Sequence, residues 1–265
     1  MRSTQVVGNP VSVVERLSLI LEAFNGVGPL TLSQVTARTG LPRSSAHRLL
    51  EQLTSVGWLA RSPEQTYELG VKAYELGQAA LKQNRLLQSA RPVMSDFAQR
   101  TGFTIQLAVL DRGDTVYLAK FNGRSSGPTP TSVGQRLPGH LTAVGKAIMA
   151  YDEVSPSHFS SRGLSPTFGS ATSLAGPGGE IPARWTAEFS QIRDTGAAFD
   201  RGEAFPGVGC IGVSIGPVDH TYGNLAAISV CGPVTSLDYR KLVSPVRVAA
   251  RAIWDRCVAV DLASG

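Results

Sequence analysis

Polar side chains of the kind that read DNA bases gather between Arg43 and Leu53. Arginine, serine, histidine and glutamine can hydrogen-bond to base edges in a major groove, and arginine also neutralises phosphate. The apolar residues of this segment recur at i, i+3, i+4 and i+7, which is typical of one buried helical face. The opposite face carries, or is bordered by, Arg43, Ser44, Ser45, His47, Arg48 and Gln52. We predict that this face enters a major groove.

A pair of short helices must hold this face in place. Thr31 and Gln34 have the spacing of a capping box, which predicts a first helix that begins near Leu32. It should end at Gly40, because glycine adopts the left-handed conformation at little cost. Pro42 suits the first turn of the second helix. This pattern favours a helix-turn-helix, and an ordinary helical hairpin with a solvated surface is the alternative. Thr31 is included among the predicted DNA contacts.

A predicted β-hairpin follows the helix pair. Residues 58–61 and 66–69 read as strands, and the turn between them contains Pro63. A hairpin in this position is typical of the wing of a winged helix-turn-helix. The side chains predicted to lie along the DNA backbone from this wing are Arg61, Gln65 and Tyr67.

The rest of the chain predicts a second domain of the α+β class. Its periodicity changes several times between helical and strand-like, which indicates an antiparallel sheet with helices packed on it. Helices are expected over 87–101, 141–151, 185–196 and 242–257, strands over 103–110, 115–121, 208–215 and 225–230, and long loops over 122–139 and 165–179. The predicted organisation is a flexible tail (1–10), a winged helix-turn-helix (11–70), a linker helix (71–85) and a second domain (86–259).

The linker helix has an apolar side that needs a partner, either the second domain or the same helix of another subunit. A homodimer suits double-stranded DNA reading, because twofold proteins match twofold operators.

Composition bounds the class of protein. The chain of 265 residues is long enough for two domains at roughly 100–200 residues each, and 42% hydrophobic content supports packed cores. A net charge of +5 permits contact with nucleic acid without demanding it. No apolar run approaches ~18 residues and no signal peptide is visible, so we expect a cytoplasmic protein without a membrane span. The three cysteines are too few for a disulfide framework.

Enzyme chemistry is considered and not favoured. Residues 212–216 fit the G-x-S-x-G pattern, which requires a strand followed directly by a helix, and the residues after it read as a turn. An esterase or amidase centred on Ser214 remains an alternative, as does a redox sensor using Cys210 and Cys231. No cysteine and histidine spacing matches a zinc site, so no metal or other cofactor is expected.

Several segments together are similar to one known family. They are LTLSQVTARTGLPRSSAHRLLEQLTSVGWL, YELGVKAYELG, TAVGKAIMA, DRGEAFPGVGCIGV and AAISVCGP. In this order the chain resembles the IclR family of bacterial transcription regulators over roughly residues 11–258. The resemblance implies a winged helix, a linker helix and a GAF-like effector-binding domain. It also implies dimers or dimers of dimers that repress or activate operons of small-molecule metabolism.

The resemblance also implies an effector pocket. Main-chain amides near Ala143 and Val144 can meet a carboxylate there. The predicted effector-binding residues are His140, Ala143, Val144, Asp200, Cys210, Ser229 and Cys231. Cys231 stands where the family often has a second serine, and a thiol hydrogen-bonds weakly. We therefore expect a small organic effector, an acid or an aromatic compound, that is less polar than a small keto acid or is held differently.

Overall fold

The structure, a computed structural model, describes residues 12–127, 129–151, 183–216 and 226–262. The predicted tail and the predicted loop over 165–179 lie outside these residues, as does the start of the strand expected at Leu225. The chain divides into two compact units, Met1–Gln83 and Asn84–Gly265.

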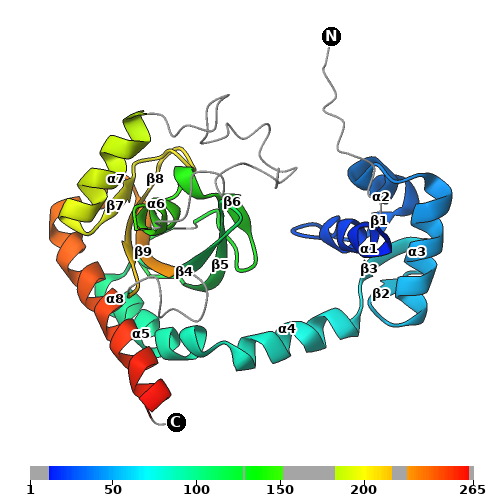
Figure 1. Cartoon of the computed structure of the whole chain (residues 1–265), viewed down its shortest axis with the longest axis horizontal. Coiled ribbons are helices and arrows are strands. Elements are labelled where there is room, and N and C mark those ends of the chain that lie inside the picture. The colour runs from blue at the N-terminus through cyan, green and yellow to red at the C-terminus, as the bar shows by residue number, and fades with distance from the viewer. Residues whose placement is uncertain (1–11, 128, 152–182, 217–225, 263–265) are drawn as a thin grey trace. The chain divides into compact units, whose positions relative to one another are not determined.

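The first unit contains the predicted helix pair and hairpin (Figure 1). Its elements are α1 (Val13–Glu22), β1 (Leu30–Thr31), α2 (Leu32–Thr39), α3 (Arg43–Ser55), β2 (Leu59–Arg61), β3 (Thr66–Leu69) and α4 (Val71–Gln83). The three strands form an antiparallel sheet in the order β1-β3-β2. Strand β1 was not predicted, because two residues are too short to show a period.

Capping residues define α2, as the sequence predicted. The hydroxyl of Thr31 accepts from the amide of Gln34 at 3.3 Å, and the side chain of Gln34 accepts from the amide of Thr31 at 2.8 Å. Gly40 ends the helix with a φ of 68°. Pro42 is the residue before α3, not its first helical residue. The predicted stripe of α3 is buried: Ala46, Leu49, Leu50 and Leu53.

The second unit has the predicted α+β class, with an antiparallel six-stranded sheet in the order β6-β5-β4-β9-β8-β7. Its strands are β4 (Thr104–Asp111), β5 (Asp114–Phe121), β6 (Arg136–Pro138), β7 (Ala198–Asp200), β8 (Val208–Ser214) and β9 (Ala226–Pro233). Its helices are α5 (Arg85–Thr101), the single turn η1 (Gly139–Leu141), α6 (Ala143–Met149), α7 (Ala183–Thr195) and α8 (Tyr239–Leu262).

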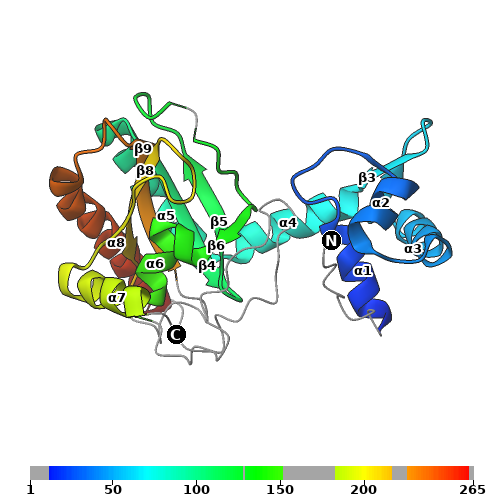
Figure 2. The same ribbon diagram turned by 90° about the horizontal axis from the view of Figure 1, so that it is seen from above.

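Helices cover both faces of this sheet (Figure 2). Successive side chains of a strand point to opposite faces. Ile105 and Leu107 of β4 pack in the core formed with α5 and α8, whereas Ala108 packs in the core formed with α6 and α7. Gln106 shares the face of Ala108, so a polar side chain is buried on the side covered by α6.

Candidate functional site

The face of α3 that is predicted to read DNA is exposed in the first unit. Arg43, Ser44, His47, Arg48 and Gln52 are exposed, and Ser45 is half-buried. The guanidinium of Arg43 donates to the hydroxyl of Ser33 on α2 at 3.0 Å. Arg48 makes no hydrogen bond or ion pair with any residue that the structure describes. Its charge is therefore available to a partner. Thr31 is half-buried at the start of α2.

Glu51 connects α3 to the hairpin of β2 and β3, the predicted wing. Its Oε1 atom accepts from Nη1 of Arg61 at 2.9 Å and from the hydroxyl of Tyr67 at 3.1 Å. Nε2 of His47 lies 3.9 Å from the same oxygen. Arg61 also donates to the side-chain oxygen of Gln65 in the wing turn. These contacts fix the wing against α3 and partly neutralise Arg61.

Tyr67 differs from the sequence expectation. Only 2% of the residue is exposed, and it packs in the core of the first unit. Burial and the hydrogen bond to Glu51 raise its pKa, so the phenol stays protonated and donates. Tyr67 therefore supports the wing from inside and is not placed to lie along a DNA backbone.

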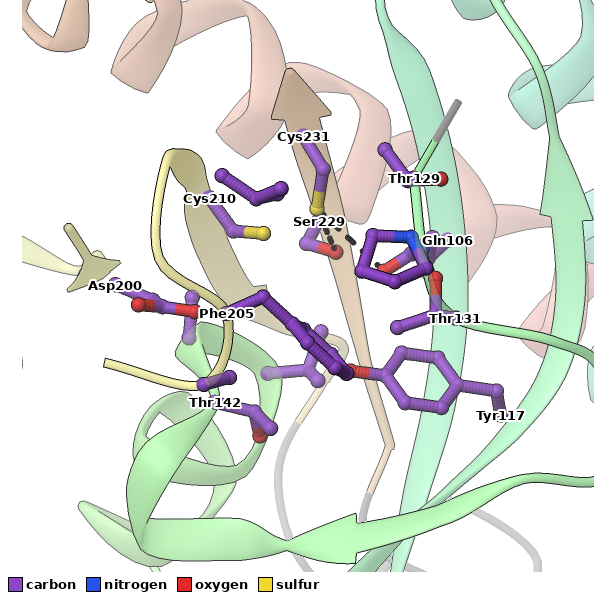
Figure 3. Close-up of a pocket in the computed structure, with 15 residues that line it drawn as sticks. Gln106, Tyr117, Thr129, Thr131, Thr142, Asp200, Phe205, Cys210, Ser229 and Cys231 are labelled. Atoms are coloured by element: carbon purple, nitrogen blue, oxygen red, sulfur yellow. Dashed lines mark hydrogen bonds between the residues drawn. The ribbon is translucent and has the colours of Figure 1, made fainter. Parts of the chain in front are cut away.

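A pocket lies on the α6 side of the sheet in the second unit (Figure 3). The empty space between its walls is about 340 Å³, including space open to solvent. Its walls are Gln106, Tyr117, Thr129, Pro130, Thr131, Thr142, Ala143, Val144, Asp200, Ala204, Phe205, Val208, Cys210, Ser229 and Cys231.

Six of the seven predicted effector residues are among these walls: Ala143, Val144, Asp200, Cys210, Ser229 and Cys231. Their binding role stays a prediction. His140 is not among the lining residues. It is buried, and its ring lies 5.6 Å from that of Trp185, edge to face. A packing role explains its position without a ligand.

Sequence reasoning missed the polar wall contributed by β4. The thiol of Cys231 donates to Oε1 of Gln106 at 3.4 Å, and the hydroxyl of Ser229 is 3.4 Å from the same sulfur. Nε2 of Gln106 donates to the hydroxyl of Thr131. The sequence did contain a signal for Gln106, because it is a glutamine between the apolar residues of a predicted strand. A buried amide needs hydrogen-bond partners, which indicates other polar groups nearby.

Lys120 of β5 holds the backbone of residues 129–131 in place beside this polar wall. Its ammonium donates to the carbonyl oxygens of Thr129 at 2.9 Å and Thr131 at 2.7 Å. Burial lowers the pKa of Lys120, and the two carbonyl oxygens hold its donors. Lys120 is not itself a lining residue. Its ammonium group stabilises the backbone conformation of residues 129–131.

The lining side chains include a carboxylate and no cation. Oδ1 of Asp200 accepts from the amides of Gly202 at 2.9 Å and Glu203 at 2.7 Å. Burial raises the pKa of Asp200. Among the described lining residues none carries a positive charge. An anionic ligand would depend on amides and hydroxyls here.

The start of α6 borders the pocket, where the sequence predicts that main-chain amides meet a carboxylate. The helix has only seven residues, so its dipole is small. The hydroxyl of Thr142 already accepts from the amide of Gly145 at 3.0 Å. The amides of Ala143 and Val144 make no hydrogen bond with any other described residue. Strand β8 lies close beneath them, because a Cβ at Gly212 would be 2.4 Å from the carbonyl oxygen of Ala143.

Lys146 joins α6 to α7 and to the loop 201–207, and these contacts were not predicted. Only 1% of it is exposed. Its ammonium is 2.8 Å from Glu188 of α7 and 2.8 Å from Glu203. Glu203 lies in the loop 201–207, which also supplies the lining residue Phe205. In Figure 3 the ring of Phe205 extends across the pocket toward the hydroxyl of Tyr117. The lysine therefore positions that loop against α6.

Other kinds of site receive no support in the described residues. No group of three or more His, Cys, Asp and Glu side chains there could hold a metal ion. None of the helices described is both long and apolar enough to cross a bilayer. Ser214 is the last residue of β8, and Ile215 and Gly216 after it are not helical. Asp219 and His220 lie outside the described residues.

Comparison with known proteins gives matches over both units. Residues 13–63 match the IclR helix-turn-helix domain, and residues 78–255 match the C-terminal domain of the bacterial transcriptional regulator IclR. The regulator XynR of Escherichia coli K12 is 29% identical over 88% of this chain and 91% of its own length. The repressor IclR of the same organism is 26% identical over 87% of this chain and 82% of its own.

A solved structure has the same fold. An IclR homolog from Microbacterium hydrocarbonoxydans, complexed with 4-hydroxybenzoate, superposes with a TM-score of 0.76 at 26% identity. The match covers 94% of this chain and all of that one.

Proposed function

Because this chain belongs to the IclR family of bacterial transcriptional regulators, we propose that occupancy of its pocket changes the affinity of α3 for an operator. The protein is a ligand-responsive, DNA-binding transcription regulator, and regulators of this kind control metabolic operons. The observation that supports the proposal best is the pocket, which is walled by residues of five strands, two loops and the start of α6 and has no cation among its lining side chains.

We assign DNA binding to the first unit and effector binding to the second. Residues 11–70 would read DNA, residues 71–85 would form the linker helix, and residues 86–259 would bind the effector. Within the first part the proposed DNA contacts are Thr31, Arg43, Ser44, Ser45, His47, Arg48, Gln52, Arg61 and Gln65. Arg48 supports this assignment most strongly, because it is exposed and holds no partner among the described residues.

The proposed effector is a small aromatic acid or a less polar aromatic compound. The rings of Tyr117 and Phe205 line the pocket and can pack against an aromatic ligand. Hydroxyls of Ser229 and Thr131 can orient polar substituents. The similar Microbacterium hydrocarbonoxydans protein is complexed with 4-hydroxybenzoate, which makes that compound a reasonable first probe.

Calorimetric titration with 4-hydroxybenzoate tests the pocket assignment. We expect measurable heat of binding for the unchanged protein and none for Ala204→Trp, because Ala204 lines the pocket from the loop 201–207 and an indole would fill the space. Ala259→Trp, on the exposed side of α8, is the matched control and should bind normally. Equal binding by both variants would place the ligand elsewhere. If the unchanged protein does not bind this probe, benzoate and phenylacetate are titrated next, and failure of all three argues against an aromatic acid.

A homodimer, or a dimer of dimers, is proposed from α4. None of its residues is buried, and its exposed apolar residues are Val71, Tyr74, Leu76 and Leu81, between 39% and 68% exposed. Such residues on one helix favour contact with another protein surface. Sedimentation equilibrium that gave the mass of a single chain would contradict this proposal.

We also propose that the protein is cytoplasmic and not an enzyme. The relatives are transcription regulators, and their work is on DNA. Ser214 lacks the helix that a nucleophile elbow requires directly after its strand. Covalent labelling of Ser214 by a fluorophosphonate would contradict the absence of catalysis.

A further inference from the structure

Two cysteines face each other in the pocket wall. Cys210 of β8 and Cys231 of β9 are directly opposite in the register of the two strands. Both line the pocket, and each is a thiol in this structure. Figure 3 shows their sulfur atoms on the same side of the sheet, turned toward the same space.

The hydrogen-bond pattern defines which kind of pair they form. In an antiparallel ladder, hydrogen-bonded pairs alternate with pairs that are not hydrogen-bonded. The amide of Ile215 donates to the carbonyl oxygen of Ala226 at 2.9 Å, and the amide of Val234 donates to the carbonyl oxygen of Gly207 at 3.0 Å. Both are therefore hydrogen-bonded pairs of the ladder. Because the two kinds of pair alternate, every second pair from Ile215 and from Gly207 is hydrogen-bonded. Cys210 and Cys231 fall between these and form a non-hydrogen-bonded pair.

That geometry suits a disulfide. The Cα atoms of a non-hydrogen-bonded pair are about 4.5 Å apart, and their side chains approach more closely than in the other kind of pair. Disulfides span Cα separations of about 4.4–6.8 Å. A bridge at this position therefore needs rotation of the side chains and little movement of the strands.

We propose that Cys210 and Cys231 form a reversible disulfide across the wall of the pocket when a small hydroperoxide enters it. Cys210 is the attacking residue, because it is half-buried, whereas Cys231 is 1% exposed. The oxidation lies outside the family function, and only its effect on effector binding rests on the proposed function.

The chemistry balances in two steps. The sulfur of Cys210, having lost its proton, attacks one peroxide oxygen. The O–O bond breaks, the other oxygen leaves with the proton as an alcohol or water, and Cys210 becomes a sulfenic acid. The sulfur of Cys231 then attacks that of Cys210, the S–O bond breaks and water leaves with the proton of Cys231. Two thiols are oxidised and one hydroperoxide is reduced.

The surroundings of Cys210 make this reaction slow. A hydrogen bond with Cys231 and burial raise the pKa of Cys210, so little thiolate is present at neutral pH. Oxidation would also remove the thiol hydrogen that Cys231 donates to Gln106, so the polar wall must rearrange.

Mass spectrometry of the full chain tests the proposal. After hydrogen peroxide treatment we expect the loss of two hydrogen atoms, reversed by dithiothreitol. N-ethylmaleimide added under denaturing conditions should then label Cys257 alone, where the untreated protein takes label at all three cysteines. Chymotryptic mapping, with cleavage after Tyr222, should recover residues 210 and 231 on two peptides that are joined by a disulfide.

Matched variants separate this pair from general thiol oxidation. Cys257→Ser, which removes a buried thiol of α8 that does not line the pocket and packs in the core with α5, should still lose two hydrogen atoms. Cys210→Ser and Cys231→Ser should not. Retention of all three labels after prolonged treatment, or a bridge that includes Cys257 or a second chain, would overturn the proposal. No DNA or effector enters this assay, so its outcome is independent of the proposed function.

Discussion

Replacing Arg48 with alanine is expected to weaken operator binding by about 5- to 150-fold, which is the effect of losing about 1–3 kcal/mol of base or phosphate contact. The guanidinium lies exposed on α3 without a partner among the described residues, so its removal should leave the domain intact. Arg43 and Arg61 already donate to Ser33 and Glu51. Replacing Arg43 with alanine should therefore reduce DNA affinity less than Arg48→Ala does. Replacing Arg61 should also disturb the wing, because its contact with Glu51 is lost.

Fluorescence anisotropy can measure this effect with a duplex that the protein itself selects from a random-sequence pool. Arg100→Ala is the control, because Arg100 is an exposed residue of the second unit in an i,i+4 pair with Asp96. It should bind like the unchanged protein. Circular dichroism of both variants should match the unchanged protein. Equal affinity of Arg48→Ala and Arg100→Ala would show that α3 does not read the duplex.

Replacing Lys146 with methionine should destabilise the effector unit by about 2–4 kcal/mol. Removing one partner of a buried ion pair typically costs ~3–5 kcal/mol. Here the lysine is 1% exposed but Glu188 and Glu203 are 33% and 40% exposed, so solvent reduces the cost of leaving them unpaired. The loop 201–207 should also lose its attachment to α6, which would weaken the pocket wall formed by Phe205.

Urea unfolding followed by tryptophan fluorescence measures this loss. The double variant Lys146→Met with Glu203→Gln should recover part of the stability, because one uncompensated carboxylate is removed with the lysine. Lys241→Met serves as control, since Lys241 is 86% exposed beside Asp238 and should change stability by less than about 0.5 kcal/mol. If Lys146→Met unfolded at the same urea concentration as Lys241→Met, the buried ion pair would have no structural role.

Local signals explain how much of the fold was predictable. The cap at Thr31, the left-handed Gly40 and the apolar stripe of α3 act within a few residues of one another, so their pattern is visible in the chain. The long strands β4 and β5 were found for the same reason. The short edge strands β6 and β7 were missed, because three residues cannot establish a period.

The candidate site was less predictable because its contacts are distant along the chain. Six effector residues could be proposed only from family resemblance. The pair of Lys146 and Glu203 is separated by 57 positions, and the contact of Cys231 with Gln106 by 125. The prediction for Tyr67 was wrong because alternation along a short strand does not reveal a contact with another element. Its hydroxyl donates to Glu51 of α3, and its ring is buried.

Coupling between the pocket and the operator can be measured in one titration. The affinity of the unchanged protein for its selected duplex is measured by anisotropy without effector and then with an effector that calorimetry has shown to saturate the pocket. We expect the dissociation constant to change by at least about fivefold, the lower end of typical allosteric coupling, and to stay constant in Ala204→Trp. An unchanged dissociation constant at full occupancy of the pocket would show that ligand binding and DNA binding are not coupled in this protein.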